Sequence, residues 1–207
     1  MKNLILLSVA LLGIYQAHAQ AKKVPAPSQA VLSNFQIDNS ATNVQWTGEK
    51  VTGSKHFGKI KVSSGNLTTT GTKLSAGIVI IDMNSLTCDD ITDAESNGNL
   101  VGHLKNEDFF NTASFPEAKL ELVKVIYKGN NAATLLGNLT IKDKTNPISF
   151  NVNIVNAGNK LTAIGKLIFD RTKYDVKYGS TLFGAAADKA IDNNVSLEIN
   201  LVANKKG

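Results

Sequence analysis

The sequence predicts an all-β protein, a closed antiparallel barrel of about eight strands with one short helix. Segments rich in Val, Ile, Thr and Leu recur along the chain and are separated by Gly, Asn, Asp and Lys. Several alternate strictly, as where Ile148, Phe150 and Val152 are set against Ser149 and Asn151. Such alternation indicates one apolar and one solvated face. With little helix to cover the apolar face, the sheet buries it best by closing on itself, which also removes exposed edges.

The strands are expected to start near Phe35 and to be joined by tight turns. Residues 128–131 and 157–159 contain Gly and Asn, which tolerate positive φ, so we expect hairpins there. The candidate strands are 35–38, 43–52, 56–63, 65–70, 74–83, 117–127, 132–142, 146–155, 160–172 and 190–202.

Two segments depart from the strand pattern. Residues 99–110 place Leu100, Leu104 and the Phe109–Phe110 pair at near-helical spacing, which predicts a short helix. Residues 181–189 are small and alanine-rich. We expect a loop or a single helical turn there, at a mouth of the barrel.

The N-terminus is typical of an exported protein. Lys2, an apolar run from Leu4 to Tyr15 and the Ala17–Ala19 stretch predict a signal peptide over residues 1–19 that is cut after Ala19. The apolar run is shorter than the roughly 20 residues that a membrane-spanning helix needs, so no stable membrane span is expected. We expect a flexible tether over residues 20–33, a barrel domain over residues 34–203, and a periplasmic or secreted location.

Composition limits the partners of the mature chain. The full chain has 22 basic and 17 acidic residues, and the predicted mature chain, which lacks Lys2, keeps a mild excess of positive charge. Its lysines alternate with apolar residues instead of forming one block. This pattern fits a solvated barrel exterior better than a groove that follows phosphates, so nucleic acid is not an expected partner. Cys88 is the only cysteine, and its expected role is that of a small buried apolar residue.

The sequence contains little that would carry catalysis. His56 and His103 are the histidines that follow the signal peptide, and neither belongs to a metal-binding motif. No cofactor, metal or catalytic residue is therefore assigned, and we expect a protein that is not an enzyme. A hydrolase-like enzyme remains an alternative, in which His103 would be oriented by Asp108 or Asp82 beside a nucleophile.

Aromatic residues are the remaining informative feature. An eight-stranded barrel has an interior that is either just filled by side chains or holds one small ligand. A lipid tail in such an interior would gain about 0.8 kcal/mol for each buried methylene group. The sequence thus permits both a binding cavity and a filled core.

Several motifs together resemble the YceI-like family. The resemblance covers about Phe35 to Val202. Its motifs are FQID at 35–38, VQWTG at 44–48, GSKHFG at 53–58, IDMNSL at 81–86, HLKNEDFF at 103–110, FPEA at 115–118 and GNLTIKDKTNPI at 137–148. Asp143 stands in a turn where the family often has glycine, and aspartate also tolerates the left-handed conformation.

The resemblance implies a lipocalin-like barrel of eight antiparallel strands with a helix near one end. It also implies a periplasmic or secreted protein that binds isoprenoids or similar long amphiphiles, and it suggests a stress-related role. We predict binding of an elongated amphiphilic lipid, namely a polyisoprenoid, an isoprenoid quinone or a fatty-acid derivative, for transport, storage or sequestration outside the cytoplasm. The second alternative is an exported interaction or adhesion module with a filled core. The oligomeric state, including a homodimer, stays open.

The candidate ligand-binding residues are the large aromatic side chains in or beside the strands and helix, together with a basic motif for a polar headgroup. The basic candidates are Arg171 and Lys173. The aromatic candidates are Trp46, Phe57, Phe109, Phe110, Phe150, Phe169 and Tyr174.

Overall fold

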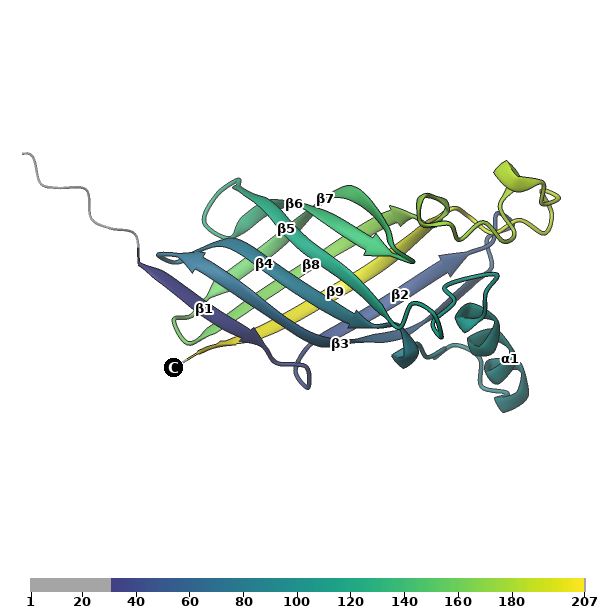
Figure 1. The fold of residues 1–207 in the computed structure, drawn as a ribbon, viewed down its shortest axis with the longest axis horizontal. Coiled ribbons are helices and arrows are strands. Elements are labelled where there is room, and N and C mark those ends of the chain that lie inside the picture. The colour runs from purple at the N-terminus through teal and green to yellow at the C-terminus, as the bar shows by residue number, and fades with distance from the viewer. Residues whose placement is uncertain (1–30, 207) are drawn as a thin grey trace, which may run out of the picture.

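The structure is a computed structural model that describes residues 31–206, in which a long antiparallel barrel carries one helix at one end (Figure 1). The predicted signal peptide and the tether up to residue 30 lie outside the described residues. The α-helix is α1 (Ala94–Lys105), and the 3₁₀ helices are η1 (Met83–Ser85), η2 (Arg171–Tyr174) and η3 (Thr181–Phe183). The strands are β1 (Leu32–Ile37), β2 (Asn43–Glu49), β3 (Lys55–Thr70), β4 (Lys73–Asp82), β5 (Glu117–Tyr127), β6 (Ala132–Ile141), β7 (Lys144–Asn156), β8 (Lys160–Asp170) and β9 (Asn194–Lys205).

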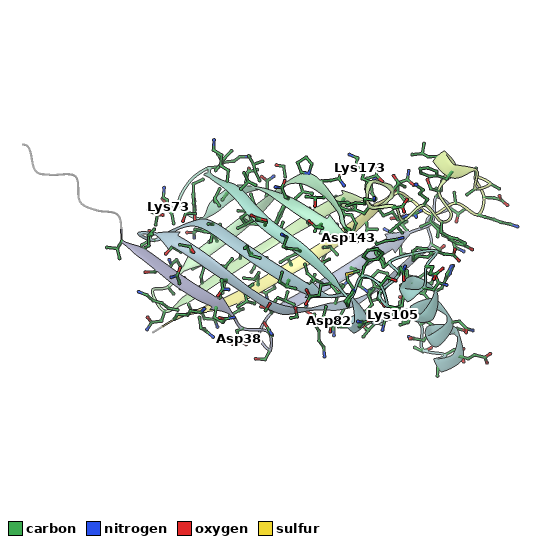
Figure 2. All side chains as sticks on the ribbon, viewed as in Figure 1. Asp38, Lys73, Asp82, Lys105, Asp143 and Lys173 are labelled. Carbon is green, nitrogen blue, oxygen red and sulfur yellow. The ribbon has the colours of Figure 1, made fainter. Side chains whose placement is uncertain are left out.

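The nine strands occupy eight positions around the barrel. β1 and β2 share one position, because each pairs with β3 on one side and with β9 on the other. The chain turns between them at Asp38, whose Oδ1 accepts hydrogen bonds from the N–H groups of Ser40 and Ala41 (Figure 2). The pairing of β3 with β4 completes the ring. The predicted closed eight-stranded lipocalin-like barrel is confirmed.

Alternation along the strands positions the core as expected. In β6 every second residue from Ala133 to Ile141 is buried, and these side chains face the barrel interior. The β6–β7 hairpin turns at Lys142 and Asp143, which have φ of 48° and 56°. Two successive positive φ angles are typical of a type I′ turn, whose twist matches the flanking strands. The expectation that Asp143 adopts the left-handed conformation is confirmed.

Several predicted element boundaries were wrong. The first strand, β1, starts at Leu32, inside the tether expected over residues 20–33, and β8 ends at Asp170 instead of residue 172. The separate strands 56–63 and 65–70 form the single strand β3, because a bulge between Val62 and Ser64 absorbs the irregularity without ending the strand. The helix predicted at 99–110 starts earlier, where Asp93 accepts a hydrogen bond from the Ser96 N–H as an N-cap. The last strand begins at Asn194 instead of residue 190.

One end of the barrel carries most of the irregular structure. The helix α1 and the long segment between β8 and β9 both lie at this end, which we call the mouth (Figure 1). The expectation of a loop or a single helical turn at residues 181–189 is confirmed by η3. Within residues 31–206, no helix has the length and apolar character that crossing a membrane requires.

The ladder between β7 and β8 ends before it reaches the mouth. Their pairing covers only residues 152–156 and 161–165, so the two strands are not paired over their mouth-side halves. Tyr174 is buried beside this stretch and packs edge-on against Phe169, with ring centroids 5.6 Å apart. Asn146 Nδ2 also donates a hydrogen bond to the Lys173 carbonyl oxygen at 3.0 Å. The helix η2 thereby closes the wall where the strand ladder stops.

Candidate binding cavity

A cavity of about 420 Å³ opens at the mouth. Its walls are the inward-facing residues at the mouth-side ends of the strands, together with α1 and the segment between β8 and β9. The aliphatic part of the lining consists of Val44, Ile60, Ile81, Met83, Leu86, Leu100, Leu104, Ala118, Leu139, Ile141, Ile191, Val195 and Leu197. The cavity volume falls within the usual range for small-molecule sites, and its walls are mainly apolar.

Trp46 forms part of the wall from β2. Its Nε1 donates a hydrogen bond to the Thr87 carbonyl oxygen at 2.9 Å, and its side chain is buried. Because this bond satisfies the only polar atom of the indole, the ring offers the cavity an apolar surface. Trp46 is also the only tryptophan of the chain.

Three aromatic rings meet at the mouth. The His103 ring lies edge-on to Phe109 and to Tyr178, with centroid distances of 4.9 Å and 4.6 Å. Phe109 reaches this position because α1 ends at Lys105 and a turn follows, in which the Phe109 N–H donates to the Asn106 carbonyl oxygen. Tyr178 is 48% exposed, so it forms the outer edge of the cluster.

Arg171 is buried at 2% exposure and holds the mouth segment through backbone carbonyl oxygens. Its guanidinium donates four hydrogen bonds of 2.8–3.1 Å, which go to Asp192, Val176, Tyr178 and Ile191. Burial lowers the pKa of Arg171, whereas the nearby carboxylates of Asp170 and Asp192 raise it. Arginine carries five N–H groups, so these bonds use four of them, and the side chain still contributes to the cavity wall.

The rim of the cavity is polar. Glu49, Lys50, Lys189 and Asp192 line it beside the aromatic cluster. The mouth can therefore surround the polar end of a ligand with charged groups of both signs, while the interior offers a mainly apolar contact surface.

His56 also lines the cavity and is held by the partly buried carboxylate of Asp90. Its Nδ1 lies 2.8 Å from Asp90 Oδ2, and Asp90 Oδ1 accepts hydrogen bonds from the Phe57 N–H and from Cys88 Sγ. Burial raises the pKa of Asp90, but the hydrogen bonds from Phe57, His56 and Cys88 outweigh it, so the pKa lies below its ordinary value. Burial raises the pKa of the Cys88 thiol, which favours the unreactive protonated form.

The candidate residues fall into two groups. Five of them line the cavity, namely Trp46, Phe109, Phe110, Phe169 and Arg171. The other four do not, and these are Phe57, Phe150, Tyr174 and Lys173. Contact with a ligand stays a prediction for the first group.

The structure shows where the four candidate residues that do not line the cavity lie instead. Phe57 is 38% exposed, because the inward positions of β3 are Gly58, Ile60 and Val62. Phe150 is buried, but away from the cavity. Tyr174 fills the wall beside β7.

Lys173, the last of these four candidates, is exposed on the outside of the mouth region (Figure 2). Its backbone carbonyl, and not its ammonium, makes the contact with Asn146.

Sequence reasoning missed several lining residues. His56 and Tyr178 were not chosen, although the alternation of His56 with Gly58 and Ile60 indicates a shared face. The mouth residues Lys189 and Ile191 lie in an irregular segment, and no periodic signal marks them.

The hydrolase alternative finds a histidine at the cavity but no nucleophile beside it. His103 lines the cavity, and its Nε2 lies 3.9 Å from Asp108 Oδ2. Among the described residues of the lining there is no serine, threonine or cysteine. Over residues 31–206, no group of three or more His, Cys, Asp or Glu side chains is arranged to hold a metal ion.

The fold and the cavity together define a lipocalin-like barrel with an apolar cavity at one end. The chain belongs to the YceI-like family, because the family's sequence model, described as the YceI-like domain, matches residues 35–203. The resemblance drawn from the sequence motifs is thus confirmed.

Individual relatives agree with this assignment. A UPF0312 protein of Shewanella denitrificans is 27% identical over 134 residues, which cover 64% of this chain and 68% of that protein. The crystal structure of BcnA from Burkholderia cenocepacia superimposes with a TM-score of 0.64 at 21% identity, covering 80% of this chain and 98% of BcnA. A polyisoprenoid binding domain from Saccharophagus degradans, implicated in plant cell wall breakdown, gives a TM-score of 0.60 at 15% identity, covering 85% and 100%. At these identities the two structures share the fold.

Proposed function

We propose that this protein binds an elongated amphiphilic lipid, with the apolar chain inside the mouth cavity and the polar end at its rim. The candidate ligands are a polyisoprenoid, an isoprenoid quinone or a fatty-acid derivative. The observation that carries this proposal is an apolar cavity of about 420 Å³ that opens beside a polar rim. The description of the Saccharophagus degradans domain as polyisoprenoid binding supports the same ligand class.

Burial of the chain supplies the affinity. Each methylene group removed from water contributes about 0.8 kcal/mol, so ten of them contribute about 8 kcal/mol before the losses of association are subtracted. Taken alone, the gross figure equals the free energy of micromolar binding, and the losses of association make the net affinity weaker. Further buried methylene groups or contacts with the charged rim must offset those losses, and the rim also orients the ligand.

Binding without a covalent step is the function that the site supports best. The hydrolase alternative requires a serine, threonine or cysteine nucleophile, and the described lining contains none near His103. The filled-core alternative requires that the barrel have no cavity, which disagrees with the open space beside Trp46. We further propose that the protein acts outside the cytoplasm, in transport, storage or sequestration, and this rests on the signal-like residues 1–19.

Native mass spectrometry of the protein purified from its native host tests the proposal. We expect a complex with one copy of a lipid, which organic extraction releases for identification. A bare mass that persists after addition of polyprenols, quinones and fatty acids would overturn the proposal and support the interaction module.

A further inference from the structure

The cavity occupies only the mouth end of a much longer barrel. On β3 the lining stops at Ile60, although the strand continues to Thr70. On β9 it stops at Leu197, although the strand continues to Lys205. The barrel seen in Figure 1 therefore extends far beyond the space that a ligand can enter.

A layer of aliphatic side chains forms the floor of the cavity. Val62, Val79, Leu120 and Leu167 are the next inward-facing residues beyond the lining on β3, β4, β5 and β8, and all are buried. Leu167 pairs across the strands with the lining residue Leu197. None of the four belongs to the lining, so this layer separates the cavity from the rest of the barrel.

Beyond the floor the barrel is packed. Phe35 and Leu161 are almost completely buried there, at 1% and 0% exposure. Even at glycines the space is taken, since a Cβ at residue 77 would lie 2.6 Å from Leu67 Cδ2. A Cβ at residue 165 would lie 2.6 Å from Val152 Cγ1. A chain that reaches the floor has no room to go further without displacing core side chains.

We propose that the barrel encloses a single apolar chain of about 14 carbon atoms, close to three isoprene units, and that any longer chain leaves its remainder outside the mouth. This inference rests on the proposed lipid-binding function. The length is an order-of-magnitude figure, obtained by dividing the cavity volume of about 420 Å³ by the roughly 30 Å³ that a water-sized group occupies in a liquid. Leu167, in the floor of the cavity, is one of the residues that limit the length of the enclosed chain.

Calorimetric titration with saturated fatty acids of about 8 to 20 carbons tests the limit. Each added methylene group should lower Kd about fourfold, the change that corresponds to about 0.8 kcal/mol, until the chain has about 14 carbons. Beyond that length Kd should stay level or rise. A fourfold gain that continues to the longest chain would overturn the inference.

Two leucine substitutions on the same strand provide the matched comparison. Leu167→Ala removes three carbons from the floor and should move the break in the series toward longer chains by about three carbons. Leu161→Ala makes the same truncation in the packed part of the barrel beyond the floor. It should leave unchanged the chain length at which Kd stops falling, although both variants lose stability. An equal shift in both variants, or a shift in neither, would overturn the role of the floor.

The two proposals fail in different ways. If no fatty acid, polyprenol or quinone of any length binds, the lipid-binding function is wrong. If lipids bind but affinity shows no break with chain length, only the limit is wrong. Should a variant not fold, the series measured on the unmodified protein still decides the question.

Discussion

Arg171 donates a hydrogen bond from Nη1 to the backbone carbonyl oxygen of Tyr178 at 2.8 Å, which links the end of β8 to the segment that covers the cavity mouth. The same guanidinium also binds the carbonyl oxygens of Val176, Ile191 and Asp192. These carbonyls belong to an irregular segment whose strand-like pairing is limited to an isolated bridge between Lys50 and Ile191. One buried side chain therefore supplies hydrogen bonds that a strand ladder would otherwise provide. Arg171 therefore gives the mouth its shape.

Replacing Arg171 should destabilise the protein strongly. Arg171→Met leaves four carbonyl oxygens, one buried and three partly buried, without these donors. We expect the unfolding free energy to fall by about 3–5 kcal/mol. Urea denaturation followed by circular dichroism measures the change. Lys173→Met is the control, because Lys173 is exposed and a surface change should stay within about 0.5 kcal/mol. Equal stability of the two variants would contradict the role of Arg171.

Filling the cavity should weaken binding without loss of stability. Ala118 lines the cavity, so Ala118→Phe takes up space that a ligand chain would use. Loss of room for about two methylene groups raises Kd about fifteenfold, and the new ring occupies more than that. Thermal unfolding should show a variant at least as stable as the unmodified protein, because the ring fills a void.

Ala133→Phe is the matched control for this experiment. Ala133 is buried in the barrel but does not belong to the cavity lining. Overpacking there should lower stability by about 1–3 kcal/mol and leave lipid affinity unchanged. If Ala118→Phe were destabilising to the same degree, the filled-core alternative would gain support.

Tyr174 should make the protein sensitive to alkali. Burial raises the pKa of Tyr174 from 10.0 to about 12, and the charge of Asp170 adds to the shift. Because the folded-state pKa exceeds the unfolded one, this stabilisation is fully present below pH 10 and is lost as pH rises toward about 12. The loss should be about 2–3 kcal/mol.

The measurement compares unfolding free energies of the unmodified protein and Tyr174→Phe across that pH range. The difference between the two curves isolates Tyr174 from lysines and other tyrosines that titrate there. Parallel curves would show that the Tyr174 hydroxyl is not held in a buried, neutral form.

Asp90 should stabilise the attachment of the segment before α1 to β3. Its carboxylate accepts hydrogen bonds from the Phe57 N–H and His56, and its pKa is lowered. Asp90→Asn should therefore lower stability by about 1–3 kcal/mol at neutral pH. The difference in unfolding free energy between Asp90→Asn and the unmodified protein should shrink as pH falls through the lowered pKa of Asp90. A carboxyl group with a lowered pKa stabilises the fold while it is ionised, and this stabilisation is lost once the group is protonated.

The neighbouring Asp89→Asn variant is the control for Asp90. Asp89 forms an ion pair with Lys59 at 3.6 Å and is 33% exposed, so its loss should change stability by less than about 1 kcal/mol. A deficit of equal size in the two variants, or one that does not depend on pH, would contradict the role of Asp90.

The alternation of apolar and polar residues along the chain predicted the barrel well, but contacts between residues far apart in the sequence determine which side chains line the cavity. The alternation around Phe150 correctly predicted a buried face, and the turn at Asp143 behaved as its residue type suggests. Phe57 was chosen for its size, although strand parity turns it outward. The four carbonyl partners of Arg171 lie 5 to 21 residues further along the chain in an irregular segment, so no periodicity could reveal them.

The most direct test of lipid binding uses Trp46, the only tryptophan, which lies on the cavity wall. Bromine atoms quench tryptophan fluorescence on contact, so a brominated fatty acid reports arrival of its chain beside Trp46. Binding in the cavity predicts saturable quenching at one ligand per protein, reversal by an excess of the unlabelled fatty acid, and a weaker effect in Ala118→Phe. Quenching that never saturates, or that Ala118→Phe leaves unchanged, would contradict it.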